Sequence, residues 1–101
     1  MEPLAIVGLS CRMPGGITAP NEFYEALLKG SDLITDVPES RWDNTFHNTT
    51  SSVGTCPTNR GGFVRGTFEF DCSFFGLSAR EAATMDPQQR MLLELAFEAA
   101  E

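Results

Sequence analysis

The amino-acid sequence predicts an α/β fold of which this chain supplies only the first part. Residues 4–9 form an unbroken apolar run between Pro3 and the turn-forming residues 14–16, which is typical of a strand covered on both faces in a parallel sheet. Residues 87–101 have the pattern of a helix that is apolar around most of its circumference, as in the middle of a large structure. The sequence supplies no neighbouring strands for the first run, and the helical pattern still continues at Glu101. We therefore expect the hydrophobic core to be incomplete.

The first helix is expected to begin at Pro20 and to stop at Gly30. Pro20 suits the first position of a helix, where its missing N–H is not needed. Apolar side chains then recur at helical spacing, and Gly30 after Lys29 is a suitable C-terminal stop. The apolar stripe consists of Phe23, Tyr24, Leu27 and Leu28.

Residues 31–60 carry few structural signals and are predicted to form a long, mostly irregular segment. Pro38, Pro57 and many Ser, Thr and Asn residues interrupt any periodic pattern. Such a loop is uncommon in a compact domain unless it packs on something or serves a function. After it, residues 61–64 and 67–70 are predicted to form a short extended pair.

Two helix starts are visible in the last third of the chain. Ser78 and Glu81 form a capping box, which predicts a short helix that ends at about Met85. Asp86 followed by Pro87 predicts the start of another helix, over residues 87–101. The narrow polar stripe of that helix consists of Arg90, Glu94, Glu98 and Glu101.

The charge balance limits the partners of the chain. With 14 acidic and 7 basic residues the net charge is −7, which argues against nucleic acid or an anionic membrane surface as a partner. No apolar run has the length of a membrane span or of a signal peptide core. Three cysteines without CxxC spacing indicate free thiols in a reducing cytoplasm, and with a single histidine they argue against a zinc site.

Cys11 is the first candidate for chemistry. It lies in the stretch GLSCRMPGG, just past the predicted strand and beside Arg12. A neighbouring cation can lower the pKa of a thiol and so create a nucleophile. The alternative is a small, inert side chain that packs after the strand.

Three stretches of the chain together resemble the opening of a β-ketoacyl synthase domain, most closely the ketosynthases of type I polyketide synthases. They are AIVGLSCRMPGG, GSDLITDVPESRWD and RGGFVRGTFEFDCSFFGLSAREAATMDPQQRMLLELAFEAAE, in this order. The part FFGLSAREAATMDPQQRMLLE is highly specific, CRMPGG is moderately so, and residues 44–59 match only loosely. The resemblance implies a thiolase-like αβαβα sandwich, with residues 1–101 as the opening part of its N-terminal half.

The resemblance also implies an activity for the parent protein. In this family a cysteine takes an acyl chain from an acyl carrier protein, and malonyl on a second carrier is decarboxylated. The carbanion then attacks the thioester in a Claisen condensation, assisted by two histidines. The acyl groups travel on the phosphopantetheine of the carrier, and this segment itself is expected to bind no cofactor and no metal. The implied partners are the acyl carrier protein, other synthase domains and a second copy in a homodimer, all in the cytoplasm.

The resemblance further implies that no catalytic residue lies within residues 1–101. The family nucleophile lies in a turn of the Asp-Thr-Ala-Cys-Ser-Ser type, which does not occur here, and the two histidines lie further on. Cys11 is then a structural residue, and Arg12 is an ion-pair or loop-fixing residue. The chain alone is predicted to be inactive.

The other chemically interesting side chains are expected to be structural. His47 has no companion at a readable spacing and is expected in a solvated loop, while Cys72 is expected in a core. Asp86 and Arg90 lie in the most specific motif, where Asp86 serves as a helix cap.

Basic side chains are the better candidates for touching a carrier protein, because carriers are acidic and would repel acidic side chains such as Glu22, Glu25 and those of residues 94–101. The basic candidates are Arg12, Arg41, Arg60, Arg65 and Arg80.

Two hypotheses for the chain follow. The first is the N-terminal fragment of a polyketide-type ketosynthase. The second is a short, non-catalytic protein of ketosynthase ancestry that docks a carrier protein or a full-length synthase. A genuine small protein should cap its last helix and bury its apolar faces, and this sequence does neither, so we expect the first. We also predict that the isolated chain is partly molten and prone to aggregation.

Overall fold

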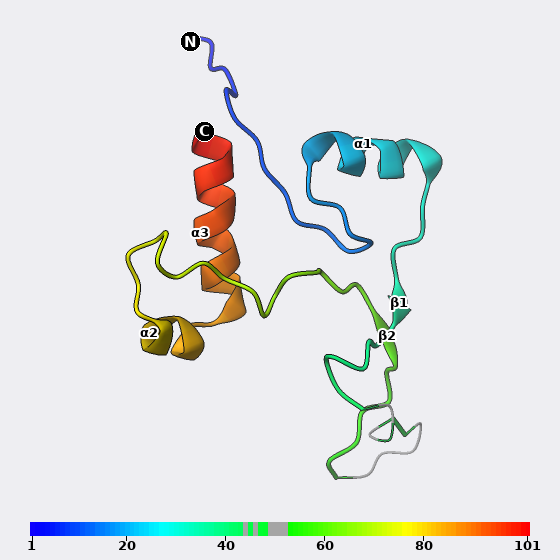
Figure 1. Ribbon diagram of the computed structural model, residues 1–101. Coiled ribbons are helices and arrows are strands. Elements are labelled where there is room, and N and C mark those ends of the chain that lie inside the picture. Colours follow the sequence, from blue (N-terminus) through cyan, green and yellow to red (C-terminus); the bar gives the residue numbers. More distant parts are fainter. Residues whose placement is uncertain (44, 46, 49–52) are drawn as a thin grey trace.

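A computed structural model describes residues 1–43, 45, 47–48 and 53–101. Within these residues there are three helices and one short two-stranded antiparallel sheet, with long irregular segments between them (Figure 1). The elements are α1 (Pro20–Lys29), β1 (Thr35–Asp36), β2 (Arg60–Gly61), α2 (Ala79–Thr84) and α3 (Pro87–Ala100). In Figure 1 the N-terminal segment runs beside α3, and the β1–β2 ribbon lies on the other side of the molecule.

The predicted strand at residues 4–9 is absent, so that prediction is wrong for this chain. A strand requires a hydrogen-bonded neighbour, and among the described residues no segment pairs with this one. Its apolar side chains are exposed instead, with Leu4 at 99% and Val7 at 97%. The backbone of the segment does approach α3 closely at Gly8. A Cβ atom added at Gly8 would lie only 1.8 Å from the carbonyl oxygen of Ala99. Glycine is therefore required at that point of contact.

Helix α1 begins and ends as the sequence predicts. Pro20 opens it, and Gly30 follows it in the left-handed conformation at φ 61°. The Gly30 N–H donates to the Leu27 carbonyl (3.2 Å) and the Ser31 N–H to the Ala26 carbonyl (3.1 Å), which together form a Schellman motif. Its apolar stripe, however, is left largely uncovered, since Tyr24, Leu27 and Leu28 are all exposed.

The small sheet differs from the extended pair that the sequence predicts. Strand β2 pairs with β1, in the register Thr35 to Gly61 and Asp36 to Arg60, and not with residues 67–70. The Val37 N–H extends this pairing to the Asn59 carbonyl at 2.9 Å. Two carbonyls of the expected hairpin are engaged by arginine side chains instead, because Arg41 donates to Val64 and Arg90 donates to Thr67.

Both C-terminal helix starts are confirmed. The Glu81 N–H donates to Ser78 Oγ (3.1 Å) and the Ser78 N–H donates to Glu81 Oε2 (2.9 Å), which completes the capping box of α2. Asp86 caps α3 through its Oδ1, which accepts from the Gln88 N–H at 2.8 Å. Helix α3 ends at Ala100, one residue earlier than predicted.

The described residues do not enclose a common core. Among them, the buried apolar side chains are Ile17, Val37 and Ala82, which lie far apart in the sequence. The Cα radius of gyration is 17.5 Å, whereas a compact domain of this length would have about 13 Å. The prediction of an incomplete core is therefore confirmed. No helix in the described part of the chain is long and apolar enough to cross a membrane.

Candidate functional site

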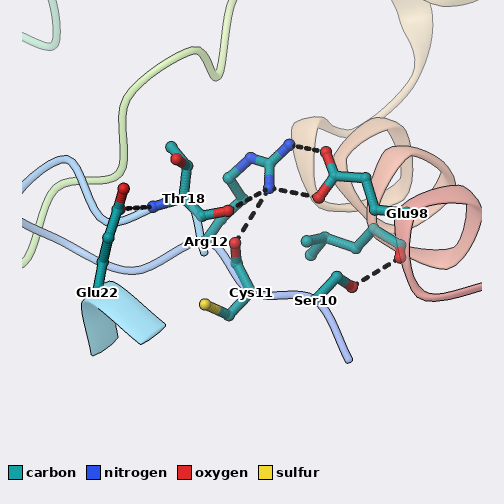
Figure 2. Close-up of polar contacts among 7 residues, drawn as sticks. Ser10, Cys11, Arg12, Thr18, Glu22 and Glu98 are labelled. Carbon is teal, nitrogen blue, oxygen red and sulfur yellow. Dashed lines mark hydrogen bonds and ion pairs between the residues drawn. The ribbon is translucent and has the colours of Figure 1, made fainter. Parts of the chain in front are cut away.

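The stretch around Cys11 is fixed to α3 by polar contacts (Figure 2). Arg12 Nη1 donates to Glu98 Oε2 at 2.8 Å, and Arg12 Nη2 donates to Glu98 Oε1, so the ion pair is bidentate. Two residues before Arg12, Ser10 Oγ donates to the Leu95 carbonyl at 2.7 Å. Arg12 thus acts as the ion-pair residue that the sequence predicts.

The ion pair changes the proton affinity of both partners. The hydrogen bonds from Arg12 lower the pKa of Glu98 below its usual value, against the opposing effect of burial. The same contact raises the pKa of Arg12 further. The side chains are 16% and 37% exposed for Arg12 and Glu98, so the pair is better shielded from water than an ordinary surface salt bridge.

The turn that follows Arg12 is closed by its own backbone. The Met13 N–H donates to the Ile17 carbonyl at 3.0 Å, and Gly15 and Gly16 between them both adopt positive φ. Arg12 Nη1 also lies 3.0 Å from the Cys11 carbonyl and 3.4 Å from the Thr18 carbonyl. One guanidinium therefore joins the end of the N-terminal segment, the far side of the turn and α3.

The thiol of Cys11 is not directed at the Arg12 guanidinium. In Figure 2 its sulfur points away from the guanidinium, and only its carbonyl accepts a hydrogen bond from Arg12. The positive charge of Arg12 is already matched by the Glu98 carboxylate. This arrangement supports the structural interpretation of Cys11, which itself stays a prediction.

A second motif from the sequence, around FFG, joins the segment before α2 to α3. The Phe74 ring meets the Phe97 ring of α3 edge-on, with centroids 4.9 Å apart, and also packs against Phe75. Asp71 Oδ1 holds the turn by accepting from Ser73 Oγ (2.8 Å) and the Phe74 N–H (3.1 Å). These hydrogen bonds lower the pKa of Asp71, that from Ser73 most. The segment around FFG therefore packs against α3 through the Phe74–Phe97 contact.

The structure also forms an aromatic cage around Arg41 that sequence reasoning missed. The guanidinium lies over the Phe63 ring at 5.6 Å and the Phe68 ring at 5.7 Å, and Nη2 donates to the Val64 carbonyl at 2.8 Å. Trp42 adds an edge-on contact to Phe63. Phe63 and Phe68 both lie more than twenty residues after Arg41 in the sequence, so no local pattern signals this contact.

The other arginines that were candidates for a carrier contact differ in their surroundings. Arg60 is used within the fold, because it donates to the Ile34 carbonyl (2.9 Å) and lies 3.7 Å from Asp36. Arg65 and Arg80 are exposed. Arg12 and Arg60 already have acidic partners, which makes them weaker candidates than the structure's other basic side chains.

The remaining predicted residues are not brought together into a site. Half-buried His47 directs Nδ1 toward the Cys56 carbonyl at 3.2 Å, so it is less solvated than expected. Cys72 is half-buried rather than fully buried, and Arg90 donates Nη2 to the Thr67 carbonyl. Within the described ranges, no three His, Cys, Asp or Glu side chains cluster closely enough to hold a metal ion.

Comparison with known proteins shows the family. Residues 1–101 match the family model described as "Beta-ketoacyl synthase, N-terminal domain". The chain belongs to the β-ketoacyl synthase family. It is 48% identical over its whole length to the phthioceranic/hydroxyphthioceranic acid synthase of Mycobacterium tuberculosis H37Rv, of which it covers 5%. It is also 49% identical over 99% of its length to a phenolphthiocerol/phthiocerol polyketide synthase of M. tuberculosis CDC 1551, of which it covers 6%.

Solved ketosynthase structures agree with this assignment. The oxazolomycin ketosynthase domain OzmH KS7 of Streptomyces albus JA3453 superimposes with a TM-score of 0.82 at 32% identity, over 93% of this chain and 16% of that one. The module 6 ketosynthase of the Bacillus subtilis 168 bacillaene synthase gives a TM-score of 0.76 at 34% identity, over 94% of this chain and 16% of that one. The fold class predicted from the sequence is confirmed as thiolase-like, with this β-ketoacyl synthase segment matching the N-terminal part of those domains.

Proposed function

We propose that this segment is the N-terminal framework of a ketosynthase domain in a polyketide synthase, and that the whole domain catalyses decarboxylative Claisen condensation. The observation that carries the proposal is the family match over all of residues 1–101, together with likeness to polyketide ketosynthases in both sequence and structure. The second support is that the guanidinium of Arg12, the neighbour of Cys11, is paired with the Glu98 carboxylate and donates to the carbonyl of Cys11.

The proposed reaction has three steps, which are acylation of a cysteine, decarboxylation and condensation. A cysteine outside this segment attacks an acyl thioester on the phosphopantetheine of a carrier protein, so that the acyl group moves to the enzyme and the carrier thiol is released. A malonyl thioester on a carrier then loses CO₂, and the electron pair of the broken C–C bond forms a carbanion. That carbanion attacks the enzyme thioester, which forms the new C–C bond and frees the cysteine thiol. The carrier protein, the other synthase domains and a homodimeric parent are part of the proposal.

The residues of this chain would position other parts of the domain. Arg12 and Ser10 fix the end of the N-terminal segment against α3, and the Phe74–Phe97 contact fixes the segment before α2 against the same helix. Helix α3 is thereby oriented from two sides. A correctly oriented helix is what a catalytic constellation built on neighbouring elements requires.

A chimaeric domain tests this proposal. Residues 1–101 replace the matching segment of the bacillaene module 6 ketosynthase, and the chimaera is incubated with acyl and malonyl carrier proteins. We expect an acyl-enzyme by mass spectrometry and a β-ketoacyl product, at rates near those of the parent ketosynthase. The variant Cys11→Ala should retain both. A folded chimaera that cannot condense, or loss of acylation in Cys11→Ala alone, would contradict the proposal.

A further inference from the structure

An open hollow of about 400 Å³ lies between the turn after Arg12 and the segment around residue 65. It is lined by Gly15, Gly16, Arg41, Phe63, Arg65 and Phe68, among others. No acidic residue is found among the described residues that line it. This is unexpected in a chain with 14 acidic and only 7 basic residues.

The two guanidinium groups of the hollow have no acidic partner in the described part of the chain. The ion pairs found there join Arg12 to Glu98 and Arg60 to Asp36, and neither involves Arg41 or Arg65. Arg41 donates one N–H to the Val64 carbonyl. A guanidinium has five N–H groups, so others are available to donate to a ligand. An anion in the hollow would be attracted by both positive charges.

The side chain of Arg65 is exposed at the rim of the hollow, and it also borders an adjoining hollow that Glu69, Asp71 and Glu94 line. A Cβ atom added at Gly16 would lie 3.2 Å from both Cζ and Nη1 of Arg65, so the guanidinium lies against the Gly16 backbone. Gly16 has φ +76° and no side chain, which leaves room for this approach. On the other side, Phe63 and Phe68 hold the Arg41 guanidinium between their rings. The Arg41 guanidinium is thus held in place, whereas the Arg65 guanidinium only borders Gly16.

We propose that this hollow is a binding site for the phosphate group of a small phosphate ester. A tetrahedral oxyanion accepts hydrogen bonds from two guanidinium groups, which are suited to phosphate by their planar forked geometry. The Phe63 and Phe68 rings on the wall of the hollow provide an apolar surface for the organic part of the ester. The site is separate from the proposed condensation reaction, whose catalytic groups lie outside this segment.

The test measures phosphate binding by the chimaeric ketosynthase, in which the rest of the domain covers the apolar faces of this segment. Inorganic phosphate and phenyl phosphate are titrated in a phosphate-free buffer, and binding is followed by calorimetry. The variant Arg65→Gln should bind both ions about tenfold more weakly, because one charged hydrogen-bond donor is lost. The matched control is Arg80→Gln, which removes another exposed charge outside the hollow and should leave binding unchanged.

The two probes also separate the sources of the phosphate group. Tighter binding of phenyl phosphate supports an organic ester, whereas equal binding would overturn the ester part and leave a site for free phosphate. High salt should weaken binding in either case, since the charges are accessible to counter-ions. If Arg65→Gln and Arg80→Gln both bind phosphate as the unaltered chimaera does, the site does not exist. The condensation assay with the same chimaera is independent of this result.

Discussion

Two parts of the N-terminal segment differ in their contacts with α3. Residues 10–12 are fixed by a hydrogen bond to Leu95 and a bidentate ion pair with Glu98. Residues 4–7 precede the close approach of Gly8 to Ala99 near the C-terminal end of α3, and their large apolar side chains are exposed. Polar contacts are made pair by pair and can be complete within a short chain. Apolar burial is collective and needs surfaces that this chain does not supply.

The largest effect should come from the point where the two parts meet. Gly8→Ala places a methyl group where the Ala99 carbonyl oxygen now lies, and the backbone must move away from α3. We expect the chimaeric ketosynthase to lose about 3 kcal/mol of unfolding free energy, as for an overpacked core. Chemical denaturation measures this loss. Asn21→Ala, on the exposed first turn of α1, serves as the control, and an equal effect of the two changes would show that the close approach does not matter.

Removal of the ion pair should have the next largest effect. Arg12→Met deletes the contacts to Glu98 and leaves that carboxylate without its partner. We expect a loss of about 2 kcal/mol in the chimaera, which is less than for a fully buried pair because Glu98 is 37% exposed. A double-mutant cycle with Glu98→Gln isolates the interaction energy. A coupling energy near zero would mean that the pair does not hold the segment to α3.

An exposed apolar residue sharpens the comparison. Val7→Ala should leave the isolated chain unchanged, because the side chain is 97% exposed. In the chimaera, where the rest of the domain covers this face, the same change should cost about 1.5 kcal/mol for two buried carbon atoms. Chemical denaturation of the chimaera with and without the change measures this cost, and the circular dichroism spectrum of the isolated chain should be the same with and without it. No cost in the chimaera would show that the face stays open in the whole domain.

The smallest effect is a dependence on pH. The pKa of Glu98 is lowered in the folded state by Arg12, so its contribution to stability is present above the unfolded pKa of about 4.3. That contribution is lost as the pH falls through the lower, folded pKa. The difference in unfolding free energy between the chimaera and its Glu98→Gln variant should therefore shrink below about pH 4, by less than about 1 kcal/mol. A difference that stays constant down to about pH 3 would contradict the assigned charge of Glu98.

The sequence predicted the features that depend on neighbouring residues. The capping box at Ser78, the cap at Asp86 and the Gly30 stop each follow from a few adjacent side chains, and all are present. The family resemblance was visible in the same way, from the specific motif before α3.

Features that join distant parts of the chain could not be predicted. Glu98 lies 86 residues after Arg12, and the partner of β2 comes from Thr35–Asp36 and not from the next turn. The strand expected at residues 4–9 needs a hydrogen-bonding neighbour, and no segment within the described residues pairs with it. The apolar pattern indicated which residues are suited to burial, but it did not show what would cover them.

The central claim is that polar contacts fix residues 10–12 to α3, while large apolar side chains of the N-terminal segment and of α1 remain exposed. The most direct test follows the isolated 101-residue chain by thermal denaturation, amide NMR and binding of a hydrophobic dye. We predict a gradual thermal transition, poorly dispersed amide signals and strong dye binding, because apolar side chains on the N-terminal segment and α1 remain exposed. A sharp cooperative transition with well-dispersed amide signals and no dye binding would contradict the claim.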